Sequence, residues 1–179
     1  MSETSDVSRG DSWTLAPVLP EERPLLERLG ELYLYDFTGF APWDVGEDGL
    51  FDHEGWARGL WADPRHTALL IRVGGKPAGF AIVSDRSTFA AGVATWYLAE
   101  FFVMRRYRRL GIGSAVARAV FDRYPGPWHV LQMTENVAAQ AFWRRVIGNY
   151  LGHPADEFTT SQGNPVQTFT APGADVSEA

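Results

Sequence analysis

The sequence lacks cysteine entirely. This absence excludes disulfides, thiolate nucleophiles and zinc sites with thiolate ligands, and it is typical of the reducing cytoplasm, where we expect this protein. Long apolar runs are lacking too, since none approaches the roughly 20 residues that a membrane-spanning helix needs. The polar, acidic segment at residues 1–12 has no apolar stretch after a basic start. We therefore expect neither a signal peptide nor a membrane partner.

Basic residues are also fewer than acidic ones. The chain has 16 lysines and arginines against 22 aspartates and glutamates, which gives a net charge of −6. Proteins that bind nucleic acids usually present a basic surface, so we expect no nucleic-acid partner. The same charge balance favours a cationic substrate. We also expect no metal.

The remaining composition predicts one globular domain. The chain has 179 residues, of which 45% are hydrophobic, and this is enough for one sizeable core. We place the domain at residues 13–171, between polar tails at 1–12 and 172–179. Apolar periodicity and turn residues predict a strand at 13–17, a helix from 20 to about 37, a short helix within 40–63, a hairpin of strands 67–73 and 78–84, a long strand at about 93–103, a helix at 114–124, a strand at 128–134, a helix from 136, and closing strands from 150 onwards and at 166–170.

The most informative segment is an arginine-rich stretch at 105–109 that leads into Leu110-Gly-Ile-Gly113, between the long strand and the helix that follows. Glycines at 111 and 113 keep Cβ atoms away from an approaching phosphate, and the helix N-terminus offers backbone amides and a positive dipole end. Arg108 or Arg109 can add charge. The pattern therefore predicts a pyrophosphate site. The alternative is a solvated arginine run before a helix start relaxed by glycine.

The sequence resembles the GCN5-related N-acetyltransferase (GNAT) family over roughly residues 13–171. Residues 108–113 match its cofactor loop, which reads Arg or Gln, two residues, Gly, any residue, Gly or Ala. The run Ala99-Glu-Phe-Phe-Val103 resembles the splayed fourth strand of the family, and Asn136-Val-Ala-Ala139 with Phe142-Trp143 resembles its pantetheine-side helix. The resemblance implies an α+β fold of α/β type: a twisted, mixed, mostly antiparallel sheet of six to seven strands, splayed at the fourth and fifth, with about four flanking helices.

The resemblance also implies acetyl-coenzyme A as co-substrate and direct transfer, in a ternary complex, to a primary amine of a small molecule. The residues implied in cofactor binding are main-chain groups of Phe102, Val103 and Met104 for the pantetheine arm, Arg108 and the amides of Arg109, Leu110, Gly111, Ile112, Gly113 and Ser114 for the pyrophosphate, and Asn136 and Phe142 for the pantetheine arm near the thiol. Asn136 is equally a helix N-cap and Phe142 equally a core residue.

Two residues are candidates for the proton transfers. Glu100 lies on the strand where relatives often carry a glutamate that polarises a water, and it is our candidate base. The alternative is an ion pair with a neighbouring arginine. Many relatives have a tyrosine acid at the position of Trp143, but an indole N–H is not a practical proton donor at neutral pH. Tyr150 is a nearby candidate acid, and otherwise water supplies the proton or the thiolate leaves unassisted.

The acceptor is indicated only by class. The tryptophans at 43, 56, 61 and 96 and the acidic residues at 44, 47, 48 and 52 form either an aromatic, acidic mouth for a cationic amine or ordinary core and solvated loop. Asp36 and His53 are weaker candidates beside this mouth.

Two other functions compete with acetyl transfer. A dinucleotide site would need a third glycine where Val116 stands. A catalytically inactive acyl-coenzyme A sensor would explain Trp143. A homodimer is compatible with the sequence, which does not fix the oligomeric state.

Overall fold

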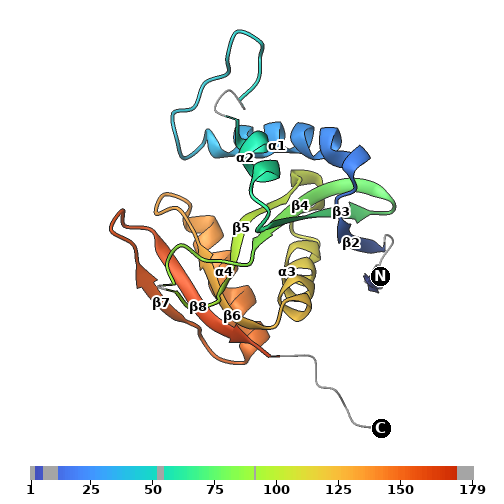
Figure 1. The fold of residues 1–179 in the computed structure, drawn as a ribbon. Coiled ribbons are helices and arrows are strands. Elements are labelled where there is room, and N and C mark those ends of the chain that lie inside the picture. The colour runs from blue at the N-terminus through green and yellow to red at the C-terminus, as the bar shows by residue number, and fades with distance from the viewer. Residues whose placement is uncertain (1–2, 6–11, 52–54, 91, 173–179) are drawn as a thin grey trace. The chain divides into compact units, whose positions relative to one another are not determined.

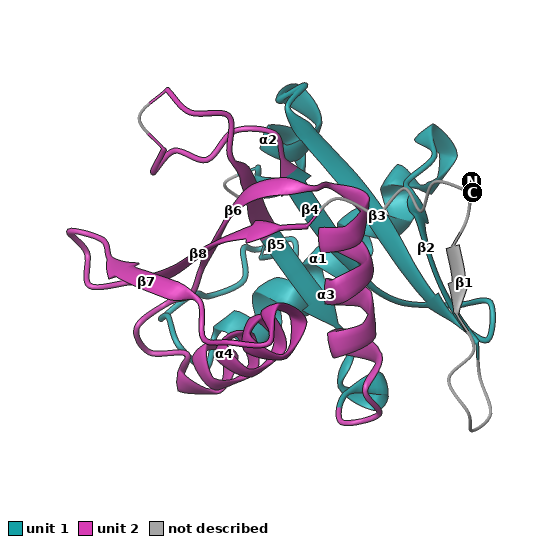
Figure 2. Cartoon of the chain, turned by 90° about the horizontal axis from the view of Figure 1, so that it is seen from below, with its two compact units in different colours: residues 1–83, 100–108 teal, residues 84–99, 109–179 magenta. Residues whose placement is uncertain are grey.

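The computed structural model describes residues 3–5, 12–51, 55–90 and 92–172. It contains two compact units, one of residues 1–83 with 100–108 and the other of residues 84–99 with 109–179 (Figure 2). The boundary falls inside strand β5 (Trp96–Val103), whose halves therefore belong to different units. The assignment of one domain between two tails stays a prediction.

The first unit contains a run of antiparallel strands and two helices (Figure 1). Its elements are β1 (Glu3–Ser5), β2 (Trp13–Pro17), α1 (Arg23–Phe37), α2 (Trp56–Ala62), β3 (His66–Val73), β4 (Lys76–Ser84) and the second half of β5. β1 pairs with β2 and β2 with β3, both antiparallel. The predicted hairpin joins β3 to β4 through Gly74 and Gly75, whose φ angles of 55° and 73° suit a tight two-residue turn.

Helix α1 begins after a 3-10 turn at Pro20–Glu22, where the Glu22 carboxylate accepts a hydrogen bond from the Leu19 amide. Its buried face comprises Leu26, Leu29, Gly30 and Leu34. Leu32 is 46% exposed, because the buried stripe follows positions 26, 29, 30 and 34. Gly30 is the point where α2 comes closest: a Cβ atom there would lie 2.4 Å from the Trp56 ring.

The second unit packs two helices against strands around an aromatic core. Its elements are the first half of β5, α3 (Ile112–Arg123), β6 (Gly126–Leu131), α4 (Val137–Leu151), β7 (Asp156–Thr159) and β8 (Pro165–Ala171). β6 and β8 pair antiparallel with Trp128 opposite Phe169, and their rings stack with centroids 6.4 Å apart. Phe121 of α3 packs edge-on against both rings, so the core lies between this helix and the strands.

The predicted fold class is confirmed. Seven predicted strands are present, and β1 is an additional strand within the described residues. All pairings with a stated register are antiparallel except that of β5 with β6, which is parallel and covers only Trp96 and Tyr97 at the start of β5. A pairing that ends this early is what a splayed pair of strands requires. One element differs from expectation: Tyr150 lies in the last turn of α4, not in a strand.

Candidate active site

Glu100, the predicted base, accepts hydrogen bonds from two aromatic side chains of its own unit. The Tyr33 hydroxyl of α1 donates a hydrogen bond to Oε2, and the Trp56 indole of α2 donates to Oε1 over 3.2 Å. Burial raises the pKa of the Glu100 carboxyl above its ordinary value, and the two hydrogen bonds oppose that rise. Within the described residues no ion pair joins Glu100 to an arginine. The neutral donors lower the pKa of this carboxyl less than burial raises it, and a raised pKa suits a general base.

Aromatic rings pack around Tyr33, one of the two donors to this carboxylate. The Tyr33 ring lies 6.1 Å from that of Trp56, 5.6 Å from that of Phe80 and 5.8 Å from that of Phe102. Phe80 and Phe102 are buried. No signal in the sequence connects Tyr33 to Glu100, which is 67 positions away.

The end of β5 is held against β4 by an unusually close approach of the two backbones. A Cβ atom at Gly79 would lie 2.0 Å from the Phe102 carbonyl oxygen, so glycine is required there. The Met104 amide donates to the Ala78 carbonyl over 2.8 Å. The Val103 carbonyl accepts from Arg108 Nε over 2.6 Å. Two of the main-chain groups predicted to face pantetheine thus already have partners within this unit, and their predicted role stays untested.

Arg108 is anchored by more than its bond to Val103. Its guanidinium pairs with Asp36 near the end of α1, and Arg105 pairs with the same carboxylate over 2.8 Å. The Arg108 guanidinium also lies 5.7 Å from the centre of the Phe102 ring. Asp36 is therefore bound to two arginines and partly neutralises the charge that Arg108 could offer to a phosphate. His53, the other weak candidate, lies outside the described residues.

In the second unit, the glycine loop has the backbone geometry of an anion site. Arg109 is the only non-glycine residue of the described chain with a positive φ, at 64°, and Gly111 follows with 81° as the N-cap of α3. No side chain caps this helix and no acidic residue lies in its first turn, so its first amides and its dipole are left for a ligand or water. A Cβ atom at Gly111 would meet nothing within 4 Å, which leaves open space before these amides. The loop fits a pyrophosphate.

The pantetheine candidates of α4 occupy its first two turns. Asn136 is the N-cap, and its Oδ1 accepts from the Ala139 amide over 3.0 Å, which confirms its capping role. Phe142 is half-buried and packs edge-on against Trp143, with ring centres 4.9 Å apart. Trp143 is buried and lies near Phe121 in the core. The cofactor roles of Asn136 and Phe142 stay predictions.

Tyr150 lies away from the glycine loop within the second unit. Its hydroxyl donates to Asp122 Oδ1 over 2.8 Å. Asp122 follows Ile112 by ten residues on α3, a rise of about 15 Å along a helix axis. Burial and the Asp122 carboxylate raise the pKa of the Tyr150 hydroxyl, which makes it a weaker acid. These contacts favour a structural link between α3 and α4.

Replacement of Tyr150 by phenylalanine tests its role directly. If Tyr150 is only a structural link, Tyr150→Phe should lower the unfolding free energy by about 1 kcal/mol and leave kcat within about twofold. If Tyr150 is the acid, the same substitution should lower kcat by about a hundredfold or more. We expect the first result in urea denaturation and steady-state assays of the same preparation. A hundredfold loss of kcat with unchanged stability would restore the catalytic role.

Solved structures with the same fold include acetyltransferases from several bacteria. The ribosomal-protein-S18-alanine N-acetyltransferase of Escherichia coli shares 17% identity, with 93% of this chain and 99% of that one covered and a TM-score of 0.57. RimJ of Mycobacterium smegmatis, in complex with CoA-disulfide, shares 16%, with 95% and 87% covered and a TM-score of 0.62. The aminoglycoside antibiotic 6'-N-acetyltransferase of Acinetobacter baumannii shares 18%, with 75% and 88% covered and a TM-score of 0.53.

At these identities the likeness shows the fold alone, and none of the curated proteins matches the sequence. The profile of the Acetyltransferase (GNAT) family, however, matches residues 26–148. The chain belongs to this family. In the parts of the chain that the structure describes, no helix is both long and apolar enough to cross a membrane. No group of acidic or histidine side chains suited to a metal ion occurs in those same parts.

Proposed function

We propose that this protein is an acetyl-coenzyme A-dependent N-acetyltransferase that acts on a primary amine of a small molecule. The observation that carries the proposal is the uncapped N-terminus of α3 behind Gly111, with its open space, in a chain of the acetyltransferase family. The CoA-disulfide complex of the similar RimJ structure supports the donor. Similar structures include enzymes for a protein alanine and for an aminoglycoside. The acidic charge of this chain supports a cationic acceptor.

In the proposed reaction, the Arg109–Ser114 amides bind the donor's pyrophosphate and hold the thioester in place. An amine attacks a thioester carbonyl only when it is neutral, so a base must first accept a proton from the ammonium form. Glu100 takes this proton, directly or through a water. The new C–N bond then forms as the C–S bond breaks. A thiolate with a pKa of about 8.5 is an adequate leaving group at neutral pH, so water can protonate it and no tyrosine is needed at Trp143.

The proposal places the protein in the cytoplasm, active without a metal, a nucleic acid or a membrane. Thiol release from acetyl-coenzyme A, measured across diamines, aminoglycosides, amino acids and short peptides, tests the reaction, and calorimetry with coenzyme A tests the donor site. We expect release with small amines. Release only with peptides would overturn the small-molecule class.

The competing function is an acyl-coenzyme A sensor, motivated by Trp143. It predicts coenzyme A binding with no thiol release on any amine. Absence of coenzyme A binding would contradict both functions. The hydrogen-bonded, partly buried Glu100 favours the enzyme, because a sensor has no need of a carboxylate with a raised pKa.

A further inference from the structure

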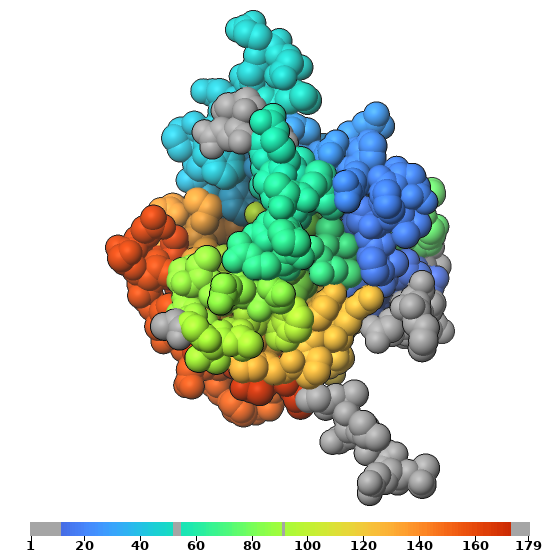
Figure 3. Space-filling model, in the orientation of Figure 1, coloured from blue at the N-terminus to red at the C-terminus, as the bar shows by residue number. Residues whose placement is uncertain are grey.

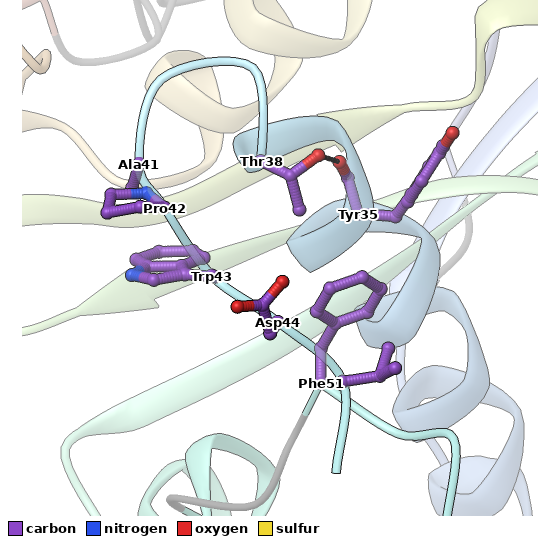
Figure 4. Close-up of a pocket in the computed structure, with 8 residues that line it drawn as sticks. Tyr35, Thr38, Ala41, Pro42, Trp43, Asp44 and Phe51 are labelled. Atoms are coloured by element: carbon purple, nitrogen blue, oxygen red, sulfur yellow. Dashed lines mark hydrogen bonds between the residues drawn. The ribbon is translucent and has the colours of Figure 1, made fainter.

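A hollow of about 450 Å³ opens at the surface of the first unit, in the loop that follows α1 (Figure 4). The rings of Tyr35, Trp43 and Phe51 line it, and the Asp44 carboxylate lies between Trp43 and Phe51. In the space-filling view the surrounding loop lies at the outside of this unit (Figure 3, cyan). Tyr35 is 55% and Trp43 43% exposed, so these large rings face solvent and leave part of their apolar surface without protein cover.

The charge around the hollow has one sign. Between Leu29 and Ala57 the chain has seven aspartates and glutamates and no lysine or arginine. Asp36 is neutralised by Arg105 and Arg108, but within the described residues no ion pair involves Asp44. An unpaired carboxylate among aromatic rings attracts a cation by charge and by the negative faces of the rings. An anion would be repelled, and a purely apolar ligand would make no use of Asp44.

Ring contacts connect this hollow to the proposed base. Tyr33, which donates to Glu100, packs edge-on against Phe37 with centroids 4.6 Å apart. Phe37 in turn stacks on Trp43 at 5.9 Å, with the planes 12° apart. One face of Trp43 is thus held by the α1 end, which fixes the ring at the wall of the hollow. The base and the hollow lie within one unit and share α1.

We infer that the hollow binds a second, non-reacting ammonium group of the acceptor, which makes the acceptor a diamine or polyamine. One nitrogen loses its proton to Glu100 and is acetylated, while another stays charged and is held by Trp43, Phe51 and Asp44. This inference rests on the proposed function for its catalytic meaning. The binding of a dication at the hollow can nevertheless be measured without catalysis.

The test compares 1,4-diaminobutane with n-butylamine, which has the same chain and one charge. Binding to the full-length protein is followed by calorimetry for Asp44→Asn, Trp43→Leu and the matched control Glu47→Gln, which removes the same charge from the same loop outside the hollow. We expect Asp44→Asn and Trp43→Leu each to weaken diamine binding about three- to tenfold and Glu47→Gln to leave it unchanged. We expect n-butylamine to bind the parent protein more weakly than the diamine, because it cannot place one ammonium in the hollow and a second amine at Glu100. In an active enzyme the same factors should appear in KM and not in kcat.

Each outcome separates the inference from the proposed function. Diamine binding that Asp44→Asn weakens, without thiol release, would support the cation site and contradict the enzyme. Thiol release with diamine and n-butylamine at equal kcat/KM would support the enzyme and overturn the cation site. Equal weakening of diamine binding by Glu47→Gln would also overturn the cation site, because the effect would then come from the overall charge of the loop and not from a site at Asp44.

Discussion

Replacing Glu100 by glutamine should lower kcat for acetyl transfer by about a hundredfold or more. Glutamine keeps the size of the side chain and can still accept a hydrogen bond from Trp56 and donate one to Tyr33, so the local structure should persist. It cannot take a proton from the acceptor ammonium. Steady-state thiol release at saturating acetyl-coenzyme A measures the loss, and unchanged coenzyme A affinity by calorimetry shows that the donor site is intact.

The same substitution should increase stability at neutral pH. Burial raises the pKa of the Glu100 carboxyl in the folded state, so folding is favoured while the group is protonated. That contribution is lost as pH rises from the ordinary glutamate value through the raised one, and above it the folded protein carries a partly buried charge. Glutamine has no such cost. The melting temperature of Glu100→Gln should therefore be higher than that of the parent at pH 8, and the difference should shrink at pH 4.5.

Tyr33→Phe provides a control that keeps the carboxylate. Loss of the hydroxyl removes one hydrogen bond that lowers the Glu100 pKa, so the acidic limb of the pH profile of kcat/KM should move to higher pH. A merely structural role of Tyr33 would leave that limb in place. If Glu100→Gln keeps its full kcat, then Glu100 is not the base, whatever happens to stability.

Replacing Gly111 by tryptophan should weaken coenzyme A binding by about 100-fold or more, equivalent to losing roughly 3 kcal/mol of phosphate contacts. A large side chain would fill the open space in front of the first amides of α3, where the pyrophosphate is expected. The φ angle of 81° adds a backbone cost, since side chains rarely adopt this conformation. Calorimetric titration with coenzyme A measures the effect.

Gly152→Trp is the matched control for the backbone cost of placing a tryptophan at a positive φ. Gly152 at the end of α4 has the same φ of 81°, and a Cβ atom there also meets nothing within 4 Å. Both variants should lose similar unfolding free energy, on the order of 1 kcal/mol. Only Gly111→Trp should lose coenzyme A affinity, while Gly152→Trp stays within about twofold of the parent. Equal affinity losses in the two variants, or none in either, would contradict the loop assignment.

The sequence was most informative where the signal is local. The hairpin at Gly74-Gly75, the helix after Gly111 and the Asn136 cap each depend on residues a few positions apart, and the structure has all three. Two helix starts differ from the predicted ones by two or three residues, since α3 begins at Ile112 and α1 begins at Arg23 after a 3-10 turn. The last turn of α4 was misread as a strand at Tyr150, because an aromatic residue suits either element and the terminating Gly152 was not used.

The sequence by itself determined the family, the fold class and the loop on which donor binding is expected, because glycine spacing and apolar periodicity are written along the chain. Only the tertiary structure decided what surrounds Glu100, what neutralises Asp36 and where Tyr150 points. These contacts join residues separated by 28 to 72 positions, and their geometry depends on how helices pack on strands. Periodicity shows which side of a helix is buried, but not which distant side chain it meets there.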